Sequence, residues 1–169
     1  MKKNLKSFYT MINMCQILIG LSVLLLGTLV YVVDRPPDLT YFVYKSSINI
    51  SLHNILPNLF GSIGNSLPSL VHVFSFILIT AGFFNCQKKG CIIICVCWFL
   101  TDVIFELGQK FKAFSSSILP NWFSGVPFLE NSKNFFLSGR FDVNDVIAIT
   151  FGTIFAYFAL SITIKRGES

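Results

Sequence analysis

The chain has 169 residues, of which 53% are hydrophobic and only 12% are charged, and its mean hydropathy is +0.68. Because soluble domains carry about 25% charged residues, this composition favours a membrane protein over a soluble one. The formal net charge is +5, but the basic residues are scattered at the ends of apolar runs. They form no folded basic face, which argues against a nucleic-acid partner.

Four apolar runs are long enough to cross a membrane as helices, since the hydrocarbon core needs about 20 helical residues. They cover roughly residues 11–33, 67–84, 91–107 and 143–164. We therefore predict an all-α, polytopic membrane helical bundle with about four transmembrane helices, in a single membrane domain over residues 1–169. The runs are too long and too continuous for the strands of a barrel.

The first run also has to be compared with a secretory signal peptide, because three lysines precede it. Its apolar stretch is longer than the hydrophobic region of a signal peptide. It also lacks a small-x-small cleavage site before Asp34. We therefore expect a retained first helix.

Basic residues next to the span ends predict the orientation. Seven of them lie in short flanks, namely Lys2, Lys3, Lys6, Lys88, Lys89, Lys165 and Arg166. The two long connecting segments hold six more, spread thinly over residues 34–66 and 109–142. Both termini and the 87–90 turn are therefore predicted to face the cytoplasm, and the two long segments become the outer loops.

The outer loops have the composition of segments that lie along the membrane surface. The 109–142 loop is rich in aromatic residues, as is typical of the interfacial aromatic belt. Several prolines in both loops argue against further long helices. Segment 48–66 is moderately apolar, and we favour a surface loop over one that re-enters the membrane.

Five cysteines lie inside or beside the apolar runs, namely Cys15, Cys86, Cys91, Cys95 and Cys97. The Cys91-x3-Cys95-x-Cys97 spacing has some likeness to a metal site, but zinc ligands usually come in pairs from separate elements. A row of small residues that face neighbouring helices is the favoured interpretation. We predict no metal, no cofactor and no structural disulfide.

The main polar feature is a stripe of Asp102, Glu106 and Gln109, which the helical spacing i, i+4 and i+7 places on one face. An ionised carboxylate that faces lipid costs several kcal/mol, so this stripe should face the bundle interior or a wet cavity. The alternating helix directions bring four further residues, from the second span and from the start of the fourth, to the same outer level. The predicted ligand-binding set is His72, Asp102, Glu106, Gln109, Arg140, Asp142 and Asp145.

Each of these residues also has a structural explanation. Asp142 and Asp145 suit the N-terminus of the last helix, where a cap and a dipole partner stabilise it by about 0.5–2 kcal/mol. Arg140 suits an ion pair with Glu106 or Asp142, and a lone histidine is more often a satisfied core residue. For any one of them the structural explanation is favoured, whereas the whole set favours a site.

The same residues resemble the VanZ-like family of small membrane proteins. The resemblance covers about residues 67–160 and is carried by His72, Phe105-Glu106-Leu107-Gly108-Gln109, Gly139-Arg140-Phe141-Asp142-Val143-Asn144-Asp145 and Gly152. The chain departs from the family pattern at Pro68 and Ile149, where the family tends to have Asp and Asn. The resemblance implies a multi-pass protein of the bacterial cytoplasmic membrane with a role in the cell envelope or in glycopeptide-antibiotic resistance, without naming a reaction.

Three functions are consistent with these residues. The favoured one is binding of a lipid headgroup, a lipid-linked envelope precursor or a glycopeptide-like ligand, with Arg140 on a phosphate or carboxylate and His72, Glu106 and Gln109 as hydrogen-bonding partners. An intramembrane enzyme with Glu106 or His72 as general base is the second, and we see no familiar hydrolase motif for it. A structural or assembly subunit is the third. Membrane lipids are the expected partners, and oligomerisation stays open.

Overall fold

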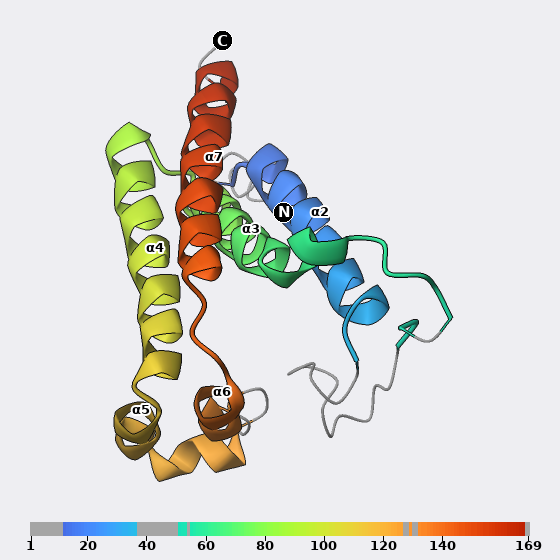
Figure 1. Cartoon of the computed structure of the whole chain (residues 1–169). Coiled ribbons are helices and arrows are strands. Elements are labelled where there is room, and N and C mark those ends of the chain that lie inside the picture. The colour runs from blue at the N-terminus through green and yellow to red at the C-terminus, as the bar shows by residue number, and fades with distance from the viewer. Residues whose placement is uncertain (1–11, 37–50, 54, 127–128, 130–131, 168–169) are drawn as a thin grey trace.

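A computed structural model describes residues 12–36, 51–53, 55–126, 129 and 132–167 of the chain. All regular structure within these ranges is helical (Figure 1). The four long helices are α2 (Met14–Val33), α3 (Leu67–Phe84), α4 (Lys88–Lys110) and α7 (Val143–Gly167). The shorter elements are η2 (Gly61–Asn65), α5 (Lys112–Ile118), η3 (Asn121–Gly125) and α6 (Ser132–Ser138).

The four long helices correspond to the four predicted apolar runs, and each is long and apolar enough to cross a membrane. The predicted all-α class is therefore confirmed for the described residues. The third helix is longer than predicted at both ends, because it includes Lys88, Lys89 and Gln109. A hydropathy criterion stops at such residues, whereas lysine and glutamine are good helix formers and continue the helix.

The predicted outer loops contain no further helix of spanning length in their described parts. The described residues of segment 48–66 form turns followed by η2, while residues 48–50 and 54 lie outside the described ranges. The amino-terminal lysines on which the predicted orientation partly depends, Lys2, Lys3 and Lys6, also lie outside them.

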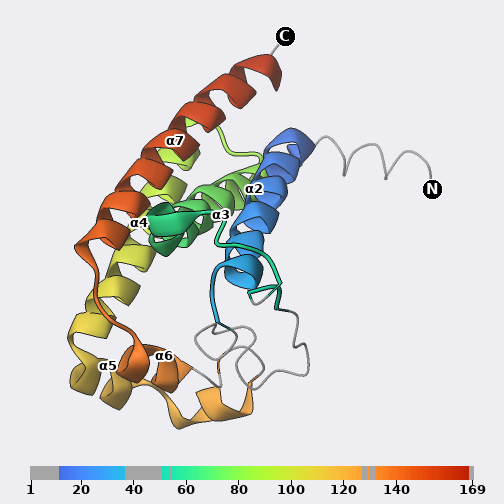
Figure 2. The ribbon, with the colours of Figure 1, turned by 45° about the vertical axis from the view of Figure 1, so that its right-hand side comes forward.

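Helix α3 is the centre of the bundle, because it packs against α2, α7 and α4. Figures 1 and 2 show α4 and α7 on one side of α3 and α2 on the other. Apolar side chains of α3, α4 and α7 form the shared core, which is made of Val73, Ile77, Leu78, Ala81, Cys91, Cys95, Ile149, Ala156 and Leu160.

Two of the three clustered cysteines face this core as predicted, and the third does not. Cys91 and Cys95 are buried, whereas Cys97 is exposed. Two residues of helix correspond to a rotation of about 200°, so Cys97 lies on the face opposite Cys95. All five thiols are free.

Glycines let α2 and α3 approach closely. A Cβ atom on Gly82 would lie 2.8 Å from the backbone oxygen of Asn13, and one on Gly27 would lie 2.6 Å from Val71 Cγ1. The Gly82 oxygen also accepts a 2.8 Å hydrogen bond from the Asn13 N–H. Small residues at such crossings are the usual means by which membrane helices pack.

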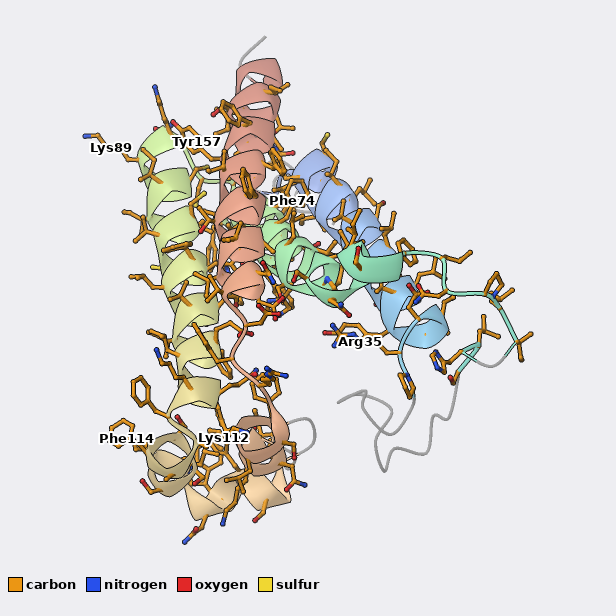
Figure 3. All side chains as sticks on the ribbon, in the orientation of Figure 1. Arg35, Phe74, Lys89, Lys112, Phe114 and Tyr157 are labelled. Carbon is orange, nitrogen blue, oxygen red and sulfur yellow. The ribbon has the colours of Figure 1, made fainter. Side chains whose placement is uncertain are left out.

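Successive long helices run in opposite directions, so the end of α2, the start of α3, the end of α4 and the start of α7 lie toward the same end of the bundle (Figures 1 and 2). We call this region the polar end. The α3–α4 turn and the end of α7 lie at the opposite end. In Figure 3, Lys89 marks that opposite end, while Arg35 and Lys112 lie toward the polar one.

The segment α5–η3–α6 extends beyond the polar end, below the start of α7 in Figure 1. It is fixed to α4 by aromatic packing, because the Phe105 ring lies 5.7 Å from that of Phe136 and 6.2 Å from that of Phe135. Phe114 and Trp122 remain 68% and 62% exposed. The interfacial location of this loop stays a prediction from its aromatic composition.

Candidate functional site

His72 on α3 and Asp102 on α4 form the central contact of the polar end. His72 Nδ1 lies 3.0 Å from Asp102 Oδ2. The Asp102 side chain is 10% exposed and the His72 side chain 46% exposed. The contact with a carboxylate favours the tautomer with a proton on Nδ1. The Nε2 atom makes no hydrogen bond with any described residue and is left available to a ligand.

The aromatic side chains beside His72 fix its position further. The imidazole centroid lies 4.5 Å from the Phe76 ring and 6.2 Å from the Trp98 ring. Trp98 in turn donates a 3.0 Å hydrogen bond from Nε1 to the Thr80 hydroxyl. The ring of His72 is therefore held by a carboxylate on one edge and by packing on its face.

Glu106 lies one helical turn beyond Asp102 on α4 and contacts the start of α7. Its carboxylate accepts a hydrogen bond from the backbone N–H of Asp142. Its Oε2 atom is buried and has no partner among the described residues. The carboxylates of Asp145, Asp142 and Asp102 all lie close enough to repel a charge on Glu106. Such a buried acceptor is unusual, because buried polar atoms are nearly always hydrogen-bonded.

The two aspartates at the start of α7 have different roles. Asp142 caps the helix, because its Oδ1 accepts a 2.9 Å hydrogen bond from the Asn144 N–H. The structural explanation of Asp142 is thus confirmed. Asp145 instead connects α7 to α3, since its Oδ1 accepts a 3.1 Å hydrogen bond from the Ser69 hydroxyl and its carboxylate also bonds to the Ser66 hydroxyl.

Among the described residues, Gln109 and Arg140 make no hydrogen bond or ion pair with the other predicted site residues. Gln109 is 7% exposed and packs against Gly139, where a Cβ atom would come within 2.6 Å of its Oε1. Arg140 is exposed and, within the part of the chain that the structure describes, forms no ion pair with Glu106 or Asp142. Glu106 uses the Asp142 backbone and Asp142 uses its carboxylate as a cap, which leaves Arg140 free to contact a ligand.

Helix α2 also contributes to the polar end, which the sequence interpretation missed. The Arg35 guanidinium lies 4.7 Å from the centre of the Tyr31 ring and donates a 2.8 Å hydrogen bond to the Asn65 oxygen. The Tyr31 hydroxyl lies within electrostatic reach of Arg35, Asp145 and Glu106. Figure 3 shows the Arg35 side chain directed from the end of α2 toward the other helices. Applying the alternating helix directions to the first span would have found these two residues.

A recess lies beside the carboxylates, between η2 and the starts of α3 and α7. Asp34 holds its outer wall in place, because its carboxylate accepts hydrogen bonds of 3.0 Å from the Leu59 N–H and 2.8 Å from the Phe60 N–H. The recess has a volume of about 370 Å³ and is lined by Ser62, Ile63, Asn65, Ser66, Leu67, Leu70, Asp142, Asn144 and Ala148.

The structure thus brings together most of the predicted set. His72 meets Asp102, and Glu106 meets Asp142 and Asp145. Among the described residues no group of three or more His, Cys, Asp or Glu side chains is arranged to hold a metal ion.

Comparison of the chain with family models, with curated proteins and with solved structures gives no match. The VanZ-like resemblance therefore stays a prediction that depends on His72, the 105–109 segment and the 139–145 segment.

Proposed function

We propose that this chain is a VanZ-like, multi-pass protein of the bacterial cytoplasmic membrane that binds a polar headgroup at its polar end. The ligand is a lipid headgroup, a lipid-linked envelope precursor or a glycopeptide-like molecule, presented from the outer leaflet. Both termini face the cytoplasm in this proposal. The supporting observation for this orientation is that Lys88 and Lys89 lie together at the opposite end of the bundle.

The buried Oε2 of Glu106 is the observation that carries the binding proposal. This oxygen has no partner among the described residues, and three more carboxylates lie nearby. A carboxylate with one buried oxygen left unpaired is costly, so a structural role alone would favour a neutral residue here. A ligand that donates hydrogen bonds from ammonium or hydroxyl groups satisfies this oxygen and relieves the repulsion.

Charge distribution changes the role that we assign to Arg140. The inner part of the site is acidic, whereas Arg35 and Arg140 lie toward its edge. A headgroup with donors at its tip places these donors on Glu106 and Asp102. In a ligand that also carries a phosphate, that phosphate meets an arginine at the edge, with the geometry that guanidinium groups favour.

The direct test replaces Glu106→Gln, which keeps the shape of the side chain and removes its charge. We expect at least a tenfold loss of co-purified or added lipid, measured by native mass spectrometry of the full chain in bacterial lipid extract. The thermal unfolding midpoint should stay unchanged or rise, because the unpaired carboxylate is removed. The matched control is Glu168→Gln, the same chemical change beyond the end of α7.

Two outcomes would contradict the binding proposal. If the Glu106→Gln variant retained as much lipid as the unaltered chain, the Glu106 carboxylate would not be part of the binding site. A lower unfolding midpoint together with a fall in the level of inserted protein would instead support a structural or assembly role for the charges.

A catalytic function is the second candidate, and the His72–Asp102 contact favours it. A carboxylate on Nδ1 with a free Nε2 is the arrangement that lets histidine accept a proton from a hydroxyl group or water. We expect an enzyme to convert a lipid-linked substrate over time, and His72→Gln to abolish that conversion while lipid binding persists. Mass spectrometry of the lipid extract before and after incubation distinguishes conversion from binding alone.

A further inference from the structure

The recess between η2, α3 and α7 has one polar and one apolar wall. The polar wall comes from η2, from the residue that follows it and from the start of α7, and it consists of Ser62, Asn65, Ser66, Asp142 and Asn144. The apolar wall consists of Ile63, Leu67, Leu70 and Ala148. A concave site with a few polar groups on an apolar base is the usual form of a small-ligand pocket.

Most of the polar wall is not used within the protein. The side chains of Ser62, Asn65 and Asn144 make no hydrogen bond with any described residue, although the Asn65 backbone oxygen accepts from Arg35. The wall therefore offers one free hydroxyl and two free amides, together with the part of the Asp142 carboxylate that does not cap α7. Hydroxyl and amide groups both donate and accept hydrogen bonds.

The lining contains one acidic residue, Asp142, and no Lys, Arg or His. Asp145 adds a second carboxylate directly behind the wall, since it accepts a hydrogen bond from Ser66. The Arg35 guanidinium, which is hydrogen-bonded to the Asn65 backbone oxygen, offsets only one of these two charges. A phosphate or carboxylate ligand placed in the recess would therefore still meet net negative charge. The two carboxylates would attract a basic group, but Asp142 already caps α7 and Asp145 already accepts hydrogen bonds from Ser66 and Ser69. Neutral hydroxyl groups match the amides and the remaining carboxylate oxygen together.

We infer that this recess binds the uncharged, hydroxyl-rich part of a ligand, such as a glycosyl or glycerol group, with an attached hydrocarbon chain along Ile63, Leu67 and Leu70. This deepens the proposed function, on which it rests, by assigning the class of headgroup and a second set of residues. The same chemistry is presented by a membrane glycolipid and by a free sugar, and the lipid is favoured by the apolar wall.

The test measures the dissociation constants of three probes for the full chain in detergent, by native mass spectrometry. The probes are a monoglucosyl diacylglycerol, a phosphatidic acid with the same acyl chains, and free glucose. The variants are Asn65→Leu and Asn144→Leu, which keep the branching and the number of side-chain heavy atoms and remove the amide. Asn121→Leu on η3, outside the recess, is the matched control.

The glucosyl lipid should bind at least tenfold more tightly than the phosphatidic acid or free glucose. Each recess variant should weaken its binding by about fivefold to tenfold, as expected for one or two lost hydrogen bonds. Asn121→Leu should change it less than twofold. Thermal unfolding midpoints that match the unaltered chain show that each variant is folded.

Tighter binding of phosphatidic acid, or equal binding by the Asn65 and Asn144 variants, would overturn the inference. If Glu106→Gln abolishes glucosyl-lipid binding and the recess variants do not, the carboxylate site stands and the recess is wrong. If the recess variants weaken binding and Glu106→Gln does not, the recess stands and the carboxylate site is wrong. Equally tight binding of free glucose would assign the recess to a soluble sugar.

Discussion

The contact between α2 and α3 and the polar end of the bundle are built on opposite principles. At the first, glycines bring two helices so close that a Cβ on Gly82 or Gly27 would clash with its neighbour. At the second, polar side chains of α3, α4 and α7 gather beside a recess and leave one carboxylate oxygen without a partner among the described residues. The first region is defined by close backbone packing, and the second by polar groups that the protein does not fully use.

This difference indicates how a small bundle separates stability from function. The close α2–α3 contact sets the position of α3, which carries His72 and Ser69 into the polar end, with Ser66 directly before its first residue. Polar groups without hydrogen-bond partners can then be tolerated at the polar end, because the positions of the helices do not depend on them. Stability is expected to reside in the glycine contacts and the apolar core, and ligand recognition in the polar end.

The largest effect is expected when the close contact is broken. Gly82→Val places branched carbons where the Asn13 oxygen and Ile17 Cγ1 already lie 2.8 Å from a Cβ. Because backbone atoms cannot move aside cheaply, the free energy of unfolding should fall by about 3 kcal/mol, the upper part of the usual range for overpacking.

Gly125→Val is the control for Gly82→Val, since nothing lies within 4 Å of a Cβ at that position. Reversible unfolding in mixed detergent micelles, followed by circular dichroism, measures both variants. Equal stability of the two would show that the α2–α3 contact is looser than the structure indicates.

The spans could be predicted from the sequence because hydropathy depends only on local composition. Helix ends were less accurate: polar residues such as Gln109 end an apolar run without ending a helix. The convergence of His72, Glu106 and Asp145 was also predictable, since it follows from alternating helix directions alone. Helix direction predicts how far along the bundle each residue lies, but it does not predict which side chain that residue contacts.

The hydrogen-bond and ion-pair partners of each side chain depend on the rotation and tilt of the helices, which the sequence pattern does not determine. Arg140 had acceptable partners in Glu106 and Asp142, yet Glu106 accepts from a backbone N–H and Asp142 caps its own helix. The recess depends on how η2 folds against Asp34, and nothing in the apolar pattern encodes that contact. The sequence interpretation did not single out Ser66 and Ser69, because uncharged hydroxyls are common in membrane helices and the role of these two appears only from their hydrogen bonds to Asp145.

An intermediate effect on stability is expected at the His72–Asp102 contact, the one ion pair found at the polar end among the described residues. A double-mutant cycle on Asp102→Asn and His72→Gln should give a coupling free energy of about 1–2 kcal/mol. The half-exposed imidazole keeps the value below that of a fully buried pair. This would show that part of the polar end also stabilises the fold.

The control for this cycle pairs Asp102→Asn with Thr101→Val. These residues are adjacent in sequence, but Asp102 contacts His72 whereas the Thr101 hydroxyl donates to the Cys97 backbone oxygen. Its coupling should stay below about 0.5 kcal/mol. Additive effects of Asp102→Asn and His72→Gln would mean that the His72–Asp102 contact serves the ligand alone.

The smallest effect is expected at a polar contact inside the well-packed region, near the end of the bundle opposite the site. Gln16 Nε2 donates a 2.9 Å hydrogen bond to Thr163 Oγ1, and Gln16 Oε1 is buried without a partner among the described residues. Thr163→Val leaves the amide unpaired and should lower the unfolding free energy by about 1 kcal/mol.

The double variant Gln16→Leu with Thr163→Val removes both partners and the orphan oxygen, so its stability should lie within about 0.5 kcal/mol of the unaltered chain. Recovery of stability on adding Gln16→Leu, measured by the same unfolding titration, would confirm that packing rather than hydrogen bonding holds α2 in place. A further loss of unfolding free energy in the double variant would instead mean that the Gln16 amide stabilises its end of the bundle, as Asp102 is expected to stabilise the polar end. The two regions would then differ only in how much their polar contacts contribute to stability.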